Sequence, residues 1–554
     1  IEVPVAISAG AADETTVDLA GPGVYPVTLQ LRGDGVVLAE TTTFVELVRE
    51  ASTAPPIHYA VTASVADPGP LASDESIEAA TDHLARLTEL VEQTDAPISV
   101  AIPPAIVARV DEREPELITR LVRALGPSDL IAAVPDLALD VSAWAEAGMQ
   151  ADIAAAFDNG RNLLDRRFID TVVNPSFWPV RTPITSEGGA ILSELGVELL
   201  VVPAETYERF PGNFGTFAPT SLLHNTVVGD GVAERIAIVD PHMALLEPDV
   251  AGSPAERAAR LLAVTTVVRY ELEPDVRGFV VTPPGLGVPD ADVVSELTDM
   301  IRDHPNDDLV DIERFTGLTN SFFVDGVTAT VALDDAPARP LGERAERDER
   351  LRGDVDDVAT MLPRTDPRPA TWRERLRWAL ADTVSDRDAE SLATEVAVGV
   401  TEVRGAVRRP EQFSFTVSGE DSPLPVRIEN TGPTPLNVVV SVSADRLATT
   451  DDIPAVLAPE AVTEVIVPVT ARSNGVFPVT VEIRSPLGTE LAEPATLTAR
   501  ANTLRGLGRV FTVAAGLVLA SWWFTYFRKR RRERTIDDVA AAQQRHPAGS
   551  ASGS

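Results

Sequence analysis

The chain has 554 residues, a formal net charge of −37, and no cysteine. Its length allows three or four domains, and its hydrophobic content of 44% is sufficient for packed cores. Because so acidic a surface repels nucleic acid and anionic lipid headgroups, we expect neither as a partner of the folded domains, and the lack of thiols excludes disulfides and thiolate metal sites.

Residues 1–52 are predicted to form β-strands. In Gly23–Arg32 apolar and polar side chains alternate, and this segment matches Gly475–Arg484 at identical or similar positions. The internal repeat predicts one β-sandwich unit present twice. The first copy has room only for the C-terminal part of a truncated sandwich. We therefore expect further sequence before Ile1, including the signal that export requires.

Residues 53–333 are predicted to form a (β/α) barrel with seven or eight parallel strands. Short apolar runs alternate with helical stretches, as where Ile57–Val65 precedes Asp74–Gln93. This alternation is typical of a parallel sheet covered by helices. An open, doubly wound sheet is the alternative. Neither GxGxxG after a strand nor GxxxxGK[ST] occurs, so the sequence gives no support for nucleotide binding.

Residues 334–409 are predicted to form a charged linker and a helical segment. Asp334–Arg368 reads as an exposed linker or a short solvated helix, and Thr371–Val403 has helical periodicity. Residues 410–502 are predicted to form an immunoglobulin-like β-sandwich. Four of its strands are expected before the repeat segment, at Phe413–Val417, Leu424–Asn430, Leu436–Ser443 and Val462–Thr470.

The segment Val510–Phe527 contains eighteen residues without a charge and is followed by five consecutive basic residues, 528–532. A helix of this length rises ~27 Å, close to the ~30 Å hydrocarbon core of a bilayer. The pattern predicts a single transmembrane helix in the cell membrane, with the large domains extracytoplasmic. The basic flank predicts that residues 528–554 form a cytoplasmic tail with a flexible end.

Several polar residues follow predicted strands, where they would face one mouth of a barrel. Asp67, Asp136, Asp240 and His242 are candidates for catalysis, and Trp178 is a candidate for stacking on a glycan ring. The alternative is that each aspartate caps the helix or turn that follows its strand.

The runs Leu130–Leu163, Asn174–Pro183 and Leu195–Pro203 resemble the polysaccharide-deacetylase/glycoside-hydrolase barrel superfamily. The stretches Pro425–Asn430 and Ser473–Val479, with the predicted anchor, are similar to uncharacterised single-pass envelope proteins of actinobacteria. Members of that family are often encoded beside the lipid II flippase. Together the resemblances cover about residues 56–530.

The superfamily resemblance implies an Asp-Asp pair after the first strand and a later HxxxH motif, which together bind a divalent metal. Here the first strand ends in a single carboxylate, Asp67, and none of the six histidines forms an HxxxH pair. We therefore predict no metal and no cofactor. The predicted function is a non-catalytic scaffold that binds a cell-wall glycan or a membrane-protein partner. The alternatives are a hydrolase or deacetylase acting at the barrel mouth, and a structural adhesin or spacer.

Overall fold

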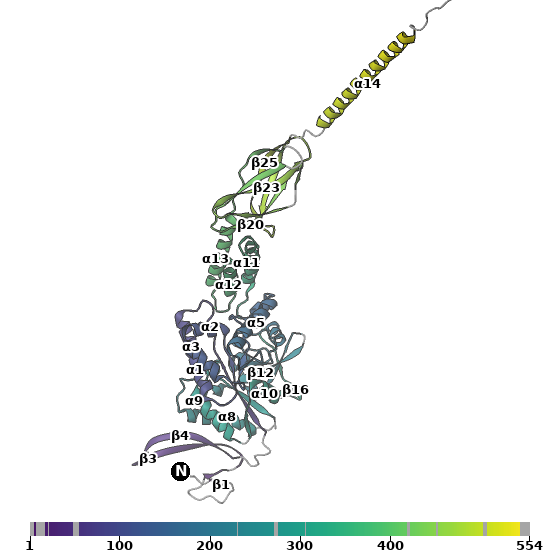
Figure 1. Ribbon diagram of the computed structural model, residues 1–554. Coiled ribbons are helices and arrows are strands. Elements are labelled where there is room, and N and C mark those ends of the chain that lie inside the picture. The colour runs from purple at the N-terminus through teal and green to yellow at the C-terminus, as the bar shows by residue number, and fades with distance from the viewer. Residues whose placement is uncertain are drawn as a thin grey trace, which may run out of the picture. The chain divides into compact units, whose positions relative to one another are not determined.

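The computed structural model describes most of the chain (Figure 1). The described residues are 5–6, 17–19, 21–47, 55–229, 231–270, 275–304, 306–417, 422–449, 452–501 and 507–542. The chain divides into two compact units, the first formed by residues 1–352 with 372–396 and the second by 353–371 with 397–554. Each unit is described by itself.

A six-stranded parallel sheet forms the centre of the first unit. Its order is β13-β5-β6-β7-β8, with β14 also paired to β5. Every residue of β5 is buried, as expected for a parallel strand with both faces covered. The strands are β5 (Ile57–Ser64), β6 (Ile98–Ala101), β7 (Leu130–Ala132), β8 (Val172–Asn174), β13 (Arg277–Val281) and β14 (Asp307–Leu309).

A second sheet of the first unit has the order β17-β11-β12-β10-β9. Strand β10 is parallel to β9 and β12, whereas β11 runs antiparallel to β12. The strands are β9 (Phe177–Pro179), β10 (Leu199–Pro203), β11 (His224–Val228), β12 (Val232–Val239) and β17 (Thr330–Val331). The two-residue strands β15 (Phe323–Val324) and β16 (Val327–Thr328) pair only with each other among the described ladders.

The prediction of a single barrel of parallel strands is therefore wrong, because the described strands do not form one continuous hydrogen-bonded sheet. The chain leaves the first sheet after Asn174 and enters the second at Phe177, so the described ladders form two sheets. Pro175 lies at this change of sheet and has no amide hydrogen to continue the ladder. The coarser prediction is confirmed: this is a multidomain α/β protein with a parallel sheet and further β-sheet modules.

The helices beside the six-stranded sheet follow the strand order. Neighbours pack in the sequence α3, α1, α9 and α8 (Figure 1). Three of these helices begin at a capping side chain: the Ser73 hydroxyl accepts from the Ser76 amide at the start of α1, and Ser253 and Asp290 similarly cap α8 and α9. The helices are α1 (Asp74–Gln93), α2 (Pro104–Arg113), α3 (Pro115–Ala124), α5 (Gln150–Arg167), α8 (Pro254–Val267) and α9 (Ala291–Asp303).

Shorter helices and turns complete the first unit. They are α4 (Val141–Glu146), α6 (Ser186–Glu194), α7 (Ala204–Tyr207), α10 (Ile312–Leu318) and the 3₁₀ segments η2 (Gly215–Phe217), η3 (Pro241–Leu246) and η4 (Val268–Tyr270). Three longer helices follow, and the division between the two units falls within each of them. They are α11 (Gly342–Met361), α12 (Arg368–Ala379) and α13 (Asp386–Gly405).

The charged stretch after residue 334 is not an exposed linker or a short solvated helix. It contains the 20-residue helix α11, whose last two turns bury Val355, Val358 and Met361. Its charges are ordered by ion pairs, including Arg344 with Asp386, and Arg352 Nη1 with Asp152 Oδ1 at 2.8 Å. Pairing between neighbouring turns and helices explains why so ionic a sequence is helical.

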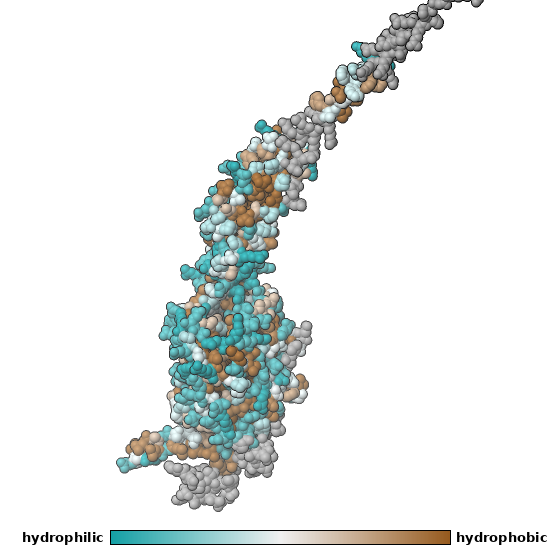
Figure 2. Space-filling model, viewed as in Figure 1, coloured by the Kyte–Doolittle hydropathy of each residue, from teal (hydrophilic) through white to brown (hydrophobic). Residues whose placement is uncertain are grey.

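The N-terminal strands β3 (Gly23–Gly33) and β4 (Val36–Leu47) form an antiparallel hairpin. Its turn residues Asp34 and Gly35 both have positive φ, 50° and 79°, as a tight two-residue hairpin turn requires. In the described residues these two strands pair only with each other, and apolar side chains such as Leu31 stay exposed (Figure 2). Strands β1 (Val5–Ala6) and β2 (Val17–Asp18) pair in parallel. The predicted boundary at residue 52 lies outside the described residues.

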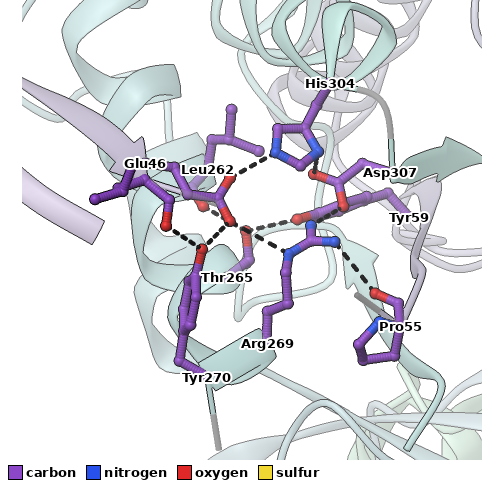
Figure 3. Close-up of polar contacts among 10 residues, drawn as sticks. Glu46, Pro55, Tyr59, Leu262, Thr265, Arg269, Tyr270, His304 and Asp307 are labelled. Atoms are coloured by element: carbon purple, nitrogen blue, oxygen red, sulfur yellow. Dashed lines mark hydrogen bonds and ion pairs between the residues drawn. The ribbon is translucent and has the colours of Figure 1, made fainter. Parts of the chain in front are cut away.

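A largely buried polar network joins the hairpin to the rest of the first unit (Figure 3). Glu46 of β4 accepts from the Tyr270 hydroxyl at 2.7 Å, and its Oε2 lies 2.5 Å from His304 Nε2. Arg269 pairs with Asp307, and its Nε lies 3.5 Å from Glu46 Oε1. Because the contacts to His304 and Tyr270 outweigh the effect of burial, the pKa of Glu46 is lowered.

The second unit contains two β-sheets in the range predicted to form a β-sandwich. A five-stranded sheet, β18-β25-β24-β20-β22, accompanies a three-stranded sheet, β19-β23-β21. Alternate residues such as Val438, Val440 and Val426 are buried. The strands are β18 (Ser414–Val417), β19 (Ser422–Asn430), β20 (Leu436–Ser443), β21 (Leu447–Thr449), β22 (Ile453–Leu457), β23 (Ala461–Ala471), β24 (Gly475–Arg484) and β25 (Glu490–Ala501). The two repeat segments are both strands paired with the strand that follows, β3 with β4 and β24 with β25. That each belongs to a copy of one sandwich stays a prediction.

Helix α14 (Leu507–Ala542) contains the predicted anchor segment and continues through the basic run. Its large apolar side chains, among them Leu517, Val518 and Trp523, are exposed. In the part of the chain that the structure describes, no helix reaches the combination of length and hydropathy that crossing a bilayer requires.

Candidate functional site

A pocket with a cavity volume of about 170 Å³ opens at the carboxyl ends of β5, β6 and β7. The chain turns sharply after each of these strands. Pro103 and Pro104 end β6 and begin α2, and Gly69, with φ of 89°, turns the loop after β5. The polar and aromatic side chains in the lining are Ser64, Asp67, Trp178, Arg181, Thr182 and Asp382.

Asp67 is held in place by its own loop. Its Oδ1 accepts a hydrogen bond of 2.8 Å from the Gly69 amide. Arg109 of α2 fixes the same loop by donating to the carbonyls of Gly69 and Pro70 at 3.0 and 3.1 Å. Burial raises the pKa of Asp67, and the Gly69 amide and Arg109 only partly offset this effect. The carboxyl is therefore held in a fixed orientation at the pocket.

Arg181, two residues after β9, is tied to the end of β5. Its Nη2 donates to the Ser64 hydroxyl at 2.8 Å and to the Leu286 carbonyl at 2.6 Å. Trp178 lies on β9 itself and packs on Phe157, with ring centroids 5.6 Å apart. The pocket thus combines a fixed guanidinium with a partly buried indole.

Two further carboxyl groups, those of Asp382 and Asp140, affect the electrostatics of the pocket. Asp382 comes from the loop between α12 and α13, and its amide donates to the Ala138 carbonyl at 3.2 Å. Burial raises the pKa of Asp382 to about 6, and the negative charges of Asp140 and Asp67 add to this shift. Asp140 is buried and caps α4 by accepting from the Ala143 amide at 3.0 Å. Burial also raises the pKa of Asp140.

Of the five predicted site residues, Asp67 and Trp178 line this pocket. Asp136 instead pairs with Arg377 Nη2 at 2.7 Å, and its neighbours Pro135 and Leu137 line the pocket. Asp136 was expected at the barrel mouth beside Asp67, but its side chain does not line this pocket.

Asp240 and His242 line a different hollow, with Thr220 and Arg277. Asp240 caps η3 by accepting from the His242 amide at 2.9 Å, and His242 Nδ1 lies 2.8 Å from the same Oδ1. Asp240 therefore caps the turn that follows its strand, which was the alternative to a catalytic role. The carboxyl does not join Asp67 in one pocket.

Sequence reasoning missed Arg181, Asp140 and Asp382. Arg181 follows a strand end closely, so the rule that selected Asp67 would have found it. Asp140 also follows a strand, β7, but only after eight residues. Asp382 arrives from a distant loop, more than 300 residues after Asp67, and no local pattern indicates it.

The divalent metal of the resembling superfamily does not fit these residues. In the ranges that the structure describes, no group of three or more His, Asp or Glu side chains is arranged to hold a metal ion. Asp67 already accepts from the Gly69 amide, and no histidine lines the pocket. We derive no metal-dependent step.

A family of unknown function, DUF6049, matches residues 243–535. The chain belongs to the DUF6049 family. No curated protein matches this DUF6049 chain. Among solved structures it is similar to a 4-alpha-glucanotransferase from Thermococcus litoralis, with 13% identity over 71% of this chain and 64% of that chain, and a TM-score of 0.41.

Two further solved structures are similar to this DUF6049 protein. One is a putative polysaccharide deacetylase from Mycobacterium smegmatis, with 15% identity over 50% of this chain and 96% of that chain, and a TM-score of 0.33. The other is an alpha-mannosidase from Enterococcus faecalis V583, with 10% identity over 81% of this chain and 57% of that chain, and a TM-score of 0.40.

Proposed function

We propose that this protein is a non-catalytic scaffold of the cell envelope that binds a glycan in the pocket at the carboxyl edge of β5, β6 and β7. The observation that carries the proposal is the lining itself. Trp178 supplies an aromatic face, and Asp67, Asp382 and Arg181 supply polar groups on the same cavity. Sugar rings are recognised by this combination, because their faces are apolar and their edges carry hydroxyl groups.

The pocket size favours a single ring. A volume of about 170 Å³ is below the roughly 300–1,000 Å³ of pockets that enclose drug-sized ligands. Ionised carboxylates accept hydrogen bonds only, whereas arginine donates only. A terminal sugar with several hydroxyl groups satisfies both kinds of partner.

Binding is tested with the full-length protein in detergent and an oligomer of β-1,4-linked N-acetylglucosamine as the probe. Trp178→Ala should abolish binding measured by calorimetry, and Asp67→Asn should weaken it about tenfold. Asp136→Asn is the matched control, because Asp136 pairs with Arg377 outside the pocket. Equal affinity of the Trp178→Ala and wild-type proteins for the oligomer would contradict the proposal.

We also propose that α14 anchors the protein in the cell membrane, with the large domains outside and the C-terminus inside. The support is the uncharged segment Val510–Phe527 and the five basic residues after it. The exposed apolar side chains of this helix are consistent with a lipid environment. Protease added to intact cells should remove the large domains and spare an epitope placed after Ser554. Digestion of that epitope would contradict the orientation.

A hydrolase is the second candidate, favoured by the two carboxyls Asp67 and Asp382. Glycoside hydrolysis uses one carboxyl that stays protonated as general acid and a second that is ionised. The pKa of Asp382 is raised to about 6, which suits the acid. Release of reducing ends from the same probe, lost in Asp382→Asn, would establish this activity in place of simple binding.

A further inference from the structure

The pocket at the carboxyl ends of β5, β6 and β7 contains one cationic side chain, that of Arg181. Its hydrogen bonds within the described part of the chain go to uncharged acceptors. Nη2 donates to the Ser64 carbonyl at 3.3 Å, to the Ser64 hydroxyl at 2.8 Å and to the Leu286 carbonyl at 2.6 Å. Among the described residues no carboxylate pairs with this guanidinium, so its charge is not balanced by a protein group.

An arginine without a carboxylate partner is unexpected at this position. The chain has 84 acidic side chains against 47 lysines and arginines, so carboxylates are in excess. Other arginines of the first unit have one, as where Arg257 Nη1 lies 3.0 Å from Asp290 Oδ2 and Arg352 Nη1 lies 2.8 Å from Asp152 Oδ1. Arg181 lacks such a partner although two carboxyl groups line its own pocket.

The guanidinium of Arg181 is fixed on one side and available on the other. All three hydrogen bonds use Nη2, which leaves Nε and Nη1 as donors without a partner in the residues that the structure describes. The side chain keeps accessible surface, so a ligand can reach these donors. The surrounding protein lowers the pKa of Arg181, and no negative charge opposes that shift. An anionic group from a ligand would be stabilised there.

The two carboxyl groups of the pocket are engaged elsewhere. Asp67 Oδ1 accepts from the Gly69 amide at 2.8 Å, and the cation that opposes the rise in the pKa of Asp67 is Arg109. For Asp382 the opposing cation is Arg339. The pocket therefore has carboxyl groups that can accept from sugar hydroxyls and, separately, a guanidinium that can bind an anion.

We propose that the sugar bound in this pocket carries a carboxylate, which accepts a hydrogen bond from Arg181 while its hydroxyl groups donate to Asp67 and Asp382. The inference rests on the proposed glycan site and names the class of sugar. One guanidinium balances one negative charge, so a carboxylate fits better than a phosphate ester, which carries nearly two. A carboxylate at C6 of the ring, as in a uronic acid, and one on a lactyl ether substituent share this chemistry.

The test compares charged and neutral forms of the same sugar by calorimetry on the full-length protein in detergent. The probes are the methyl glycosides of glucuronic acid and of N-acetylmuramic acid, each paired with its own primary amide. In at least one pair the acid should bind about tenfold more tightly than the amide, because one charge-assisted hydrogen bond is gained. The pair with the larger preference identifies the source of the carboxylate.

The outcomes separate this inference from the glycan site itself. Binding of the amides and of the N-acetylglucosamine oligomer with no preference for either acid would overturn the inference and leave the glycan site standing. Failure of every sugar to bind at millimolar concentration would overturn both.

Variants assign the preference to Arg181. Arg181→Gln should abolish the difference between acid and amide, whereas Arg181→Lys, which keeps the charge, should retain part of it. Arg123→Gln is the matched control, because Arg123 is exposed on α3 and lies outside the lining. If Arg181→Gln does not fold, the comparison of acid with amide in the wild-type protein still decides. A preference for the acid that persists in folded Arg181→Gln would overturn the assignment.

Discussion

The Nε2 atom of His304 lies 2.5 Å from Oε2 of Glu46, and this contact joins the end of α9 to the N-terminal hairpin. The two side chains expose only 16% and 13% of their surface. Arg269, Tyr270 and Asp307 surround the pair, so its loss would leave other buried groups with fewer partners (Figure 3).

We predict that Glu46→Gln lowers the free energy of unfolding by about 2 kcal/mol, the contribution of a hydrogen bond to a charged partner in a half-buried setting. Amide hydrogen exchange should rise in β3 and β4. Glu40→Gln, at an exposed position of the same strand, should change stability by less than about 0.5 kcal/mol. Equal stability of the two variants would show that the network does not hold the hairpin.

The same contact predicts a pH dependence. Because the pKa of Glu46 is lowered in the folded protein, its contribution to stability is present above the carboxyl's ordinary pKa. That contribution is lost as pH falls through the folded value. The difference in urea midpoint between wild type and Glu46→Gln should therefore shrink on acidification. A difference that grows at low pH would contradict the assignment.

The repeat offers a matched pair of core substitutions. Ile483 of β24 and Leu31 of β3 occupy the same position of the repeat, but they expose 1% and 64% of their surface. Ile483→Ala should destabilise the second unit by about 2–5 kcal/mol, through lost burial and a residual cavity. Leu31→Ala should change stability by less than about 0.5 kcal/mol. Denaturant unfolding measures both, and a large effect of Leu31→Ala would reveal a cover over the hairpin.

The proposed glycan pocket should respond to pH through Asp382. Its pKa of about 6 means that it ionises between pH 5 and pH 7. If it accepts a sugar hydroxyl as a carboxylate, affinity for the N-acetylglucosamine oligomer rises over this range. Calorimetry on Asp382→Asn should give a flat profile. A profile of the variant that matches wild type would exclude Asp382 from binding.

Much of the regular structure is predictable because local signals agree. The expected strand Ile57–Val65 and helix Asp74–Gln93 correspond to β5 and α1, since an apolar run is followed by the Ser73 cap and a helical period. The change of sheet at Pro175 was not predicted. Proline is common in loops, so Pro175 alone does not indicate that a sheet ends at this point. Only the pairing of strands in the folded chain shows it.

The site was predictable only in part. Asp67 and Trp178 lie on or just after strands, and the strand-end rule places them together. The same rule placed Asp136 in the pocket wrongly, because it predicts where a residue lies and not where its side chain points. The side chain of Asp136 pairs with Arg377. Asp382 is delivered by tertiary folding from a loop far along the chain, so no spacing in the sequence indicates it.

The position of β5 has a consequence for synthesis. This wholly buried strand pairs with β13 and β14, and Ile57 has Asp307 as its register partner about 250 residues later. At 5–20 residues per second, the ribosome needs roughly 10–50 s to supply that partner. Throughout this interval the first three residues of this buried strand lack their β14 neighbour. We therefore expect the nascent chain to need shielding at this strand until β14 emerges.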